Sequence, residues 1–143
     1  VLVGHKEKLK PLMKEHGISN HPQVELVHAE ETVNMDEPST VALRSKKNSS
    51  ITIAAGLVSK GEADAVVSAG HNGAAVAATK VKMRMIPGVD RPAIGIIMPA
   101  VQGPFILIVA GANIDSKPIN LAQFAVMGEA FARLAFSTLR PRI

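Results

Sequence analysis

The residues best suited to chemistry lie in a glycine-bracketed turn at residues 68–73, which reads Ser-Ala-Gly-His-Asn-Gly. An apolar, strand-like segment at residues 65–67 precedes the turn, and a helix-like segment of small residues begins at Ala74. Main-chain N–H groups at such a turn have no partner within the helix, and the positive end of the helix dipole attracts anions. The turn therefore predicts a phosphate site, at which His71 is a candidate direct contact. In the alternative interpretation, the glycines only let the chain turn sharply.

A second candidate loop precedes the last predicted helix. Asn113 and Lys117 are candidate polar contacts to a substrate at this second helix N-terminus. Alternatively, the loop is only a turn and a cap, in which Asp115 or Ser116 caps the helix and Pro118 occupies its first turn. Both interpretations can hold, because a capped helix start still presents spare N–H donors outward.

A basic run at residues 44–50 also leads into a predicted helix. Lys46 and Lys47 are candidate phosphate ligands, because cations at a helix N-terminus oppose its dipole unless an anion binds there. Ser49 is predicted to cap this helix, and Gly61 is predicted to end it. The alternative is an ordinary solvated basic face.

His28 ends a predicted strand beside Glu30 and Glu31, where it is either an acid–base group or a partner in a strand-end hydrogen bond. The chain has no cysteine, and no two histidines have the spacing of metal ligands, so the sequence predicts no metal site. Ser68 does not belong to a G-x-S-x-G elbow, which argues against a serine nucleophile.

Charge and composition favour an acidic partner. The net charge is +4 and the pI is near 9.6, which suits phosphorylated metabolites, an acidic carrier protein, nucleic acid or anionic lipid. With four Phe and no Tyr or Trp, the chain lacks stacking platforms for nucleic acid, so that class is set aside. The absence of cysteine, of an apolar run long enough for a membrane span and of a signal-peptide pattern leads us to expect a cytoplasmic protein.

Strand-like and helix-like segments alternate along the chain. Helices are expected at residues 5–15, 50–60, 74–84 and 119–136, and strands at 2–3, 24–28, 65–67, 93–98, 105–109 and 142–143. The near-continuous apolar runs at 93–98 and 105–109 predict strands covered on both faces. The alternation predicts an α/β fold, three-layered with a largely parallel sheet, as a single domain or a fragment of one over residues 1–143. Ligands of such sheets bind beyond the carboxyl ends of the strands.

Taken in order, several segments resemble the bacterial phosphate acyltransferases of phospholipid synthesis, the PlsX family. The matching segments are residues 27–30, 36–38, 44–50, 63–70, 86–93, 111–118, 123–128 and 140–142. The chain departs from the family pattern at His71-Asn72, where Asn-Thr is common, and at Val109, where Asp is common. Several ordered motifs over nearly the whole chain are more specific than any single one of them.

The resemblance implies an enzyme that moves a fatty acyl group from acyl carrier protein to inorganic phosphate, giving acyl phosphate. It implies a fold like that of isocitrate and isopropylmalate dehydrogenases and of phosphotransacetylases, of which this chain is the N-terminal and middle part. It also implies a homodimer that needs no metal and no cofactor. A cytoplasmic location with peripheral contact at the inner face of the membrane is a further expectation. Alternatives are a phosphotransacetylase-like enzyme that uses acyl-coenzyme A, and a non-catalytic phosphate- or nucleotide-binding module.

The resemblance places phosphate near two groups of residues. The first group comprises the turn residues Ser68, Gly70, His71, Asn72 and Gly73 together with Lys46 or Lys47. The second group, across a cleft from the first, comprises Asn113 and Lys117. The catalytic residues are not identified, and the candidates are Lys117, Asn113 and His28. We expect the acidic carrier protein to be drawn to a basic surface.

Overall fold

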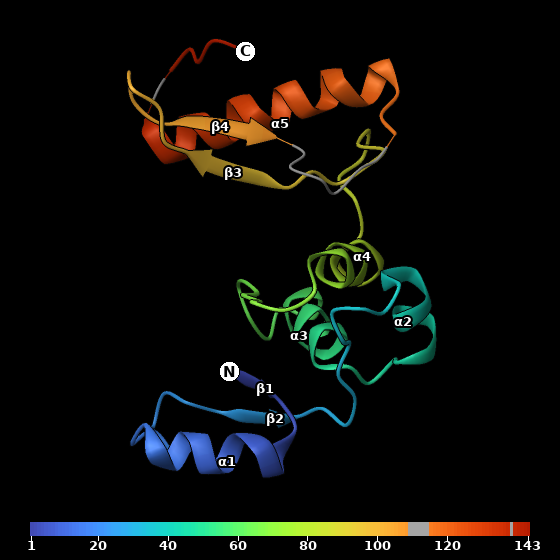
Figure 1. Cartoon of the computed structure of the whole chain (residues 1–143), viewed down its shortest axis with the longest axis vertical. Helices are drawn as coiled ribbons and strands as arrows, with labels where there is room; N and C mark the ends of the chain where they lie inside the picture. The colour runs from blue at the N-terminus through green and yellow to red at the C-terminus, as the bar shows by residue number, and fades with distance from the viewer. Residues whose placement is uncertain (109–114, 138) are drawn as a thin grey trace. The chain divides into compact units, whose positions relative to one another are not determined.

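The chain divides into two units, Val1–Arg84 and Met85–Ile143, in the computed structural model (Figure 1). The structure describes residues 1–108, 115–137 and 139–143. The candidates Val109 and Asn113 therefore lie outside the described residues. None of the described helices is both long enough and apolar enough to cross a membrane.

The first unit begins with a strand–helix–strand element. Strands β1 (Leu2–Gly4) and β2 (Leu26–His28) pair in parallel, with Val3 opposite Val27, and helix α1 (Lys6–Glu15) connects them. Parallel strands need such a crossover, because a tight turn can join only antiparallel neighbours. The predictions of a helix at 5–15 and of strands at 2–3 and 24–28 are confirmed in type, with shorter bounds for the second strand.

Three helices pack together after this element: α2 (Ser39–Ser45), α3 (Ser50–Ser59) and α4 (Asn72–Met83). Their contact surfaces are built from alanine, and the fully buried members are Ala42, Ala55, Ala74 and Ala78. Small side chains let helix axes approach closely, which suits this tight cluster. Helix α2 was not expected from the sequence, because seven residues are too few to show a clear helical period.

Helix α3 begins and ends at the residues that the sequence predicts. Ser49 is the N-cap residue, although its buried hydroxyl bonds to the Thr52 hydroxyl at 2.8 Å rather than to a main-chain N–H. At the other end, Gly61 has a φ of +74°, and its N–H donates to the Val58 carbonyl at 3.0 Å. The Glu62 N–H donates to the Leu57 carbonyl at 2.9 Å, which completes a Schellman motif.

The predicted strand at residues 65–67 is wrong for this structure. The segment is extended but belongs to neither sheet, and Val67 is 97% exposed. Its N–H and C=O groups form no hydrogen bond with any described strand. A strand exists only as part of a ladder, so a β-like sequence without a neighbour stays irregular.

The second unit is a hairpin covered by one helix. Strands β3 (Gly95–Met98) and β4 (Phe105–Ile108) are antiparallel, and helix α5 (Pro118–Phe136) packs against β4. Helix α5 packs so closely on the hairpin that two positions must be glycine. A Cβ on Gly95 would lie 2.9 Å from Phe131 Cδ1, and a Cβ on Gly128 would lie 3.2 Å from Ile108 Cγ1.

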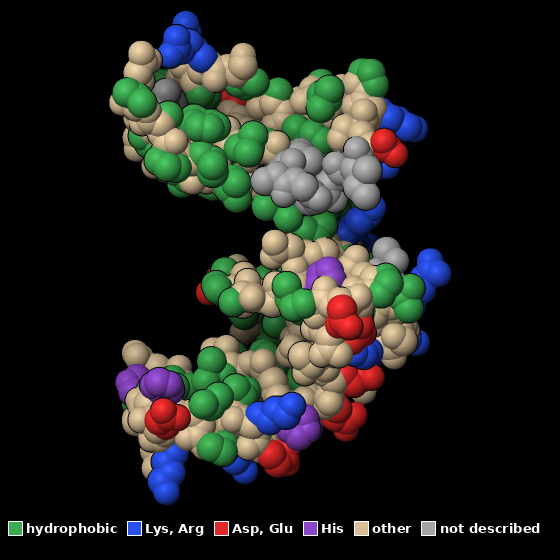
Figure 2. Space-filling view, viewed as in Figure 1, with side chains coloured by type: hydrophobic (Ala, Val, Ile, Leu, Met, Phe, Trp, Pro, Cys, Tyr) green, Lys and Arg blue, Asp and Glu red, His purple; other side chains and the backbone are tan. Residues whose placement is uncertain are grey.

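The arrangement of β3 and β4 corrects two expectations. The pair is antiparallel, so the described strands form one parallel and one antiparallel pair rather than a largely parallel sheet. Coverage on both faces is also wrong, because Ile97 is 51% exposed and Leu107 is 42% exposed. Figure 2 shows hydrophobic side chains gathered on the surface over these strands.

The C-terminal residues 142–143 form no strand, contrary to expectation, and they pair with none of the described strands. The chain is nevertheless mixed α/β, as the alternation of segments predicts. The three-layer architecture stays a prediction.

Candidate functional site

The turn at residues 68–73 leads directly into α4 and leaves main-chain donors free. His71 is the N-cap residue of α4, and its Nδ1 accepts a hydrogen bond from the Ala74 N–H at 3.3 Å. The Gly70 N–H donates to the Ser68 hydroxyl at 3.3 Å. The N–H groups of Asn72 and Gly73, by contrast, donate to no described residue. Two adjacent amides at the positive end of a helix dipole suit an anionic oxygen.

Both ring nitrogens of His71 are occupied. Nε2 lies 2.9 Å from the main-chain oxygen of Glu37, while Nδ1 accepts from the Ala74 N–H. Because a carbonyl oxygen only accepts, Nε2 carries the proton and the ring is the neutral Nε2–H tautomer. His71 therefore shapes the start of α4 and joins it to the segment before α2, with no ring nitrogen left over in this arrangement.

Glu37 links this turn to Lys46. Its carboxylate forms an ion pair with the Lys46 ammonium, which also donates to the Thr32 carbonyl at 2.8 Å. The hydrogen bond from Lys46, followed by one from the Asn34 N–H at 3.2 Å, lowers the pKa of Glu37 below its ordinary value. The predicted phosphate ligand Lys46 thus lies near the turn, with its charge largely matched by Glu37.

Gly73 is required by packing as well as by the turn. A Cβ placed on it would lie 3.1 Å from the Cβ and Oγ of Ser39 and 3.1 Å from the His71 ring. Gly70 is much less confined, since its nearest neighbour would be the Ser68 hydroxyl at 3.6 Å. The two glycines of the turn therefore have different roles, which their spacing alone could not reveal.

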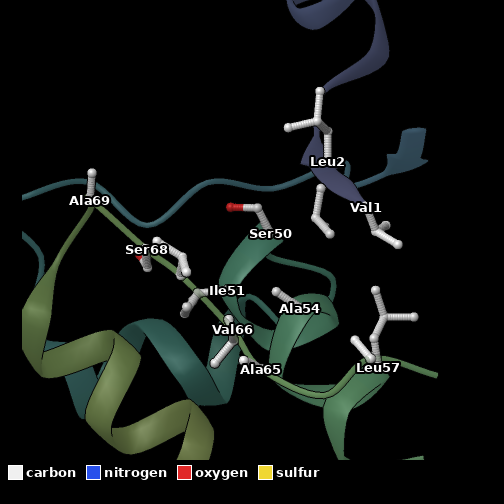
Figure 3. A pocket seen from close by; sticks show the side chains of 13 residues that line it. Val1, Leu2, Ser50, Ile51, Ala54, Leu57, Ala65, Val66, Ser68 and Ala69 are labelled. Carbon is white, nitrogen blue, oxygen red and sulfur yellow. The ribbon is translucent and has the colours of Figure 1, made fainter. Parts of the chain in front are cut away.

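A cavity of about 350 Å³ borders Ser68 (Figure 3). Its walls come from β1, from α3 and from the extended segment that leads into the turn. The lining is mostly aliphatic, with the hydroxyls of Ser50 and Ser68 as its polar side-chain groups. Strand β1 and residues 65–67 thus line the same cavity, without a ladder hydrogen bond between them.

Lys47 lies in a different place from Lys46. Its side chain is exposed and lines a cavity together with Arg44, and no contact joins it to the turn. Although Lys46 and Lys47 are adjacent in the sequence, their side chains lie in different places. Only Lys46 forms an ion pair with Glu37.

In the second unit, Lys117 is the N-cap residue of α5. Its N–H donates to the side-chain oxygen of the buried Asn120 at 3.0 Å, so the helix is capped from within. The expectation that Asp115 or Ser116 caps the helix is wrong, because Asn120 reaches back to the position after them. The placement of Pro118 in the first turn is confirmed. The exposed Lys117 side chain has no carboxylate partner among the described residues.

Two residues without a predicted role hold the loop before β3. Gln123 on α5 donates to the Gly88 carbonyl at 2.8 Å and accepts from the Asp90 N–H at 3.2 Å. Arg91 Nη1 donates to the Asp115 carbonyl at 2.6 Å. Both belong to segments that matched the family pattern, which was the only sequence signal for them.

His28 forms the expected strand-end hydrogen bond. Its Nδ1 accepts from the Lys6 N–H at 3.3 Å, and its ring packs edge-on against that of His5 at 5.4 Å. Within residues 1–108, 115–137 and 139–143, no group of three His, Asp or Glu side chains could hold a metal ion.

Comparisons with known proteins cover the entire chain. A family profile described as "Fatty acid synthesis protein" matches residues 1–143. A protein of Alcanivorax borkumensis named phosphate acyltransferase is 42% identical over 143 residues, which are 100% of this chain and 42% of that protein. Proteins of the same name from Janthinobacterium sp. and Geobacter sulfurreducens are each 44% identical, over 100% and 99% of this chain and 40% and 41% of their own lengths. The chain thus spans about two-fifths of the length of these curated relatives.

Proposed function

The chain belongs to the fatty acid synthesis protein family, and we propose that the complete protein transfers a fatty acyl group from acyl carrier protein to inorganic phosphate. The product is an acyl phosphate for phospholipid synthesis. Support comes from relatives named phosphate acyltransferase that are 42–44% identical over nearly the whole chain. Since the chain spans about two-fifths of those relatives, it supplies part of the proposed active site.

The observation that carries this proposal is the pair of free amides on Asn72 and Gly73 at the start of α4. Phosphate is an oxygen-rich anion, and main-chain N–H groups at a helix N-terminus bind such anions without any change of side-chain charge. Ser68 and Gly70 complete the turn, while His71 holds its shape. Lys46 or Lys47 is the proposed cation: Lys46 is linked to the turn through Glu37, with which phosphate competes, whereas Lys47 lines a separate cavity beside Arg44.

The proposed reaction is an attack of phosphate on a thioester. A phosphate oxygen bonds to the carbonyl carbon, the carbon–sulfur bond breaks, and the carrier's thiol leaves with the proton that phosphate gives up. Positioning of the anion and donors for the tetrahedral oxyanion are the main needs of this step. Lys117, Asn113 and His28 stay the candidate catalytic groups, each to be tested by single substitution. The step draws on no metal and no redox cofactor.

The wider setting of the activity is also a proposal. We place the chain in a three-layer α/β/α fold like that of isocitrate and isopropylmalate dehydrogenases, within a homodimer. The parallel β1–α1–β2 element is compatible with such a fold. A cytoplasmic location, with peripheral contact at the membrane where acyl phosphate is consumed, follows from the same activity. The net charge of +4 favours an acidic carrier protein as donor.

The test uses one substitution that removes a proposed main-chain donor and a second that controls for loss of the side chain. Asn72 is the first residue of α4 and follows His71, whose ψ of 108° is extended, so proline fits at position 72 without breaking the helix. Asn72→Pro deletes the amide N–H, whereas Asn72→Ala keeps it and removes only the side chain. We expect Asn72→Pro to raise the KM for phosphate by about tenfold or more, as for a lost hydrogen bond to a charged group, and Asn72→Ala to change it little.

The measurement is incorporation of labelled inorganic phosphate into acyl phosphate by the complete protein with acyl carrier protein as donor. Equal effects of the two variants would reject the amide site while leaving the activity in place. No product from the folded parent protein would reject the acyltransferase. Product from acyl-coenzyme A alone would favour the phosphotransacetylase-like alternative, and nucleotide binding without turnover would favour the non-catalytic module.

A further inference from the structure

A second, larger cavity of about 720 Å³ lies among α2, α3 and α4. Aliphatic groups form much of its lining, and four cations stand around it. The lining residues are Leu43, Arg44, Lys47, Thr52, Ala77, Ala78, Lys80, Val81 and Lys82. Val81 is 69% exposed, and all four cations are exposed, so the cavity opens to the surface.

The charge around this cavity is not neutralised. Residues 38–61 and 65–89, which include all three helices, contain no Asp or Glu. Within the part of the chain that the structure describes, no carboxylate pairs with Arg44, Lys47, Lys80 or Lys82, whereas Lys46, Lys60 and Arg133 each have one. A cluster of unpaired like charges costs free energy that an acidic partner would recover.

Helix dipoles explain part of this pattern. Arg44 lies in the last turn of α2, and Lys80 and Lys82 lie in the last turn of α4, where cations are favourable. The dipole accounts for basic side chains but not for the apolar hollow between them. A hollow with apolar lining and a charged border is the shape that receives an amphipathic helix.

We propose that this cavity, with its four cations, is the docking site for an acidic amphipathic helix of the carrier protein that brings the acyl thioester. The inference rests on the proposed function, which supplies an acidic carrier as donor. Apolar side chains of the helix enter the hollow beside Val81, and its carboxylates face the cations. A membrane surface is the less suitable occupant, because a flat anionic surface calls for apolar side chains that protrude rather than for a recess.

The test neutralises cations that have no part in the phosphate site. Lys80→Gln/Lys82→Gln removes two charges from the border of the cavity, and Lys8→Gln/Lys10→Gln removes two exposed charges with the same spacing from α1. In the complete protein, we expect the first pair to weaken binding of fluorescently labelled acyl carrier protein about tenfold at low salt and to flatten its salt dependence. The control pair leaves binding nearly unchanged, and both leave the KM for phosphate unchanged.

A third variant separates the apolar part of the site from the charged part. Val81→Ser removes aliphatic surface without a change in charge, so we expect weaker carrier binding with an unchanged salt dependence. Equal effects of the two lysine pairs, or none from any variant, would overturn the docking site even if the parent makes acyl phosphate. The measured binding of labelled acyl carrier protein tests the docking site even if the parent protein makes no acyl phosphate. Binding to phosphatidylglycerol vesicles that the Lys80 and Lys82 substitutions abolish, with carrier binding intact, would assign the cavity to lipid and overturn the inference.

Discussion

The imidazole ring of His71 bridges the N-terminus of α4 and the main-chain oxygen of Glu37, 2.9 Å from its Nε2. Through this bridge the turn at residues 68–73 is held against the segment before α2. The side chain of the same Glu37 forms the ion pair with Lys46. A single residue pair therefore connects the proposed amide donors to the nearest proposed cation.

The bridge predicts a graded series at position 71. His71→Ala removes both hydrogen bonds, so it should lower the free energy of unfolding by about 1–2 kcal/mol. His71→Asn keeps an N-cap acceptor for the Ala74 N–H and loses only the link to Glu37. Its free energy of unfolding should therefore fall by only about half as much as that of His71→Ala. Urea unfolding of the three proteins checks the order, and equal losses in both variants would contradict a capping role.

The ion pair predicts a pH dependence of stability. The pKa of Glu37 is lowered by Lys46 and the Asn34 N–H, so its stabilising effect is fully present above the ordinary Glu value of about 4.3 and is lost as pH falls through the lowered folded-state pKa. Glu37→Gln should therefore be less stable than the parent at pH 7, with the difference vanishing in acid. Urea midpoints from pH 7 to pH 2 measure this. The exposed Glu30→Gln is the matched control, and an identical profile for both variants would contradict the prediction.

The two glycines of the turn should respond differently to alanine. Gly73→Ala places a Cβ 3.1 Å from Ser39, so we expect a loss of about 1 kcal/mol in unfolding free energy. Gly70→Ala makes only ordinary contact with Ser68, and its effect should stay within about 0.5 kcal/mol. Adding Ser39→Gly should restore part of the loss in Gly73→Ala, because it removes the opposing Cβ. Thermal melts of the single and double variants test this; additive losses would rule out the contact.

The loop before β3 should loosen when Gln123 is shortened. Gln123→Ala removes the acceptor of the Asp90 N–H and the donor to the Gly88 carbonyl. We expect faster hydrogen exchange at the Asp90 amide and little change at Val89, whose N–H donates to the Ile86 carbonyl at 3.0 Å. The exposed Gln102→Ala serves as control, and unchanged exchange at Asp90 would show that Gln123 does not hold the loop.

Local signals in the sequence were reliable where the chemistry is local. Gly61 ends α3 in the left-handed conformation that glycine favours, and Pro118 starts α5 where its missing N–H has no cost. The cap of α5 was predicted wrongly, since Asn120 acts from inside the helix while Asp115 and Ser116 looked like better caps. Competing short-range acceptors are hard to rank without coordinates.

Pairing between distant segments was less predictable. Residues 65–67 have a strand-like composition, yet they form no ladder, because none of the described strands hydrogen-bonds to them. The apolar runs at β3 and β4 suggested buried parallel strands, but the two form an antiparallel hairpin with one face exposed. Hydrophobicity marks a strand, and the direction and number of its neighbours depend on the rest of the fold.

The sequence by itself determined the types of the main elements, the turn that leads into α4, and membership of the family through its ordered motifs. Only the tertiary structure decided that His71 caps α4 and bonds to Glu37, and that Lys46 pairs with Glu37 while Lys47 lines a separate cavity. It also decided that residue 73 must be glycine, because Ser39 packs against it. The physical reason is range. Backbone preferences act over a few residues and can be read along the chain, whereas hydrogen bonds and close contacts between distant segments exist only once packing has brought those segments together.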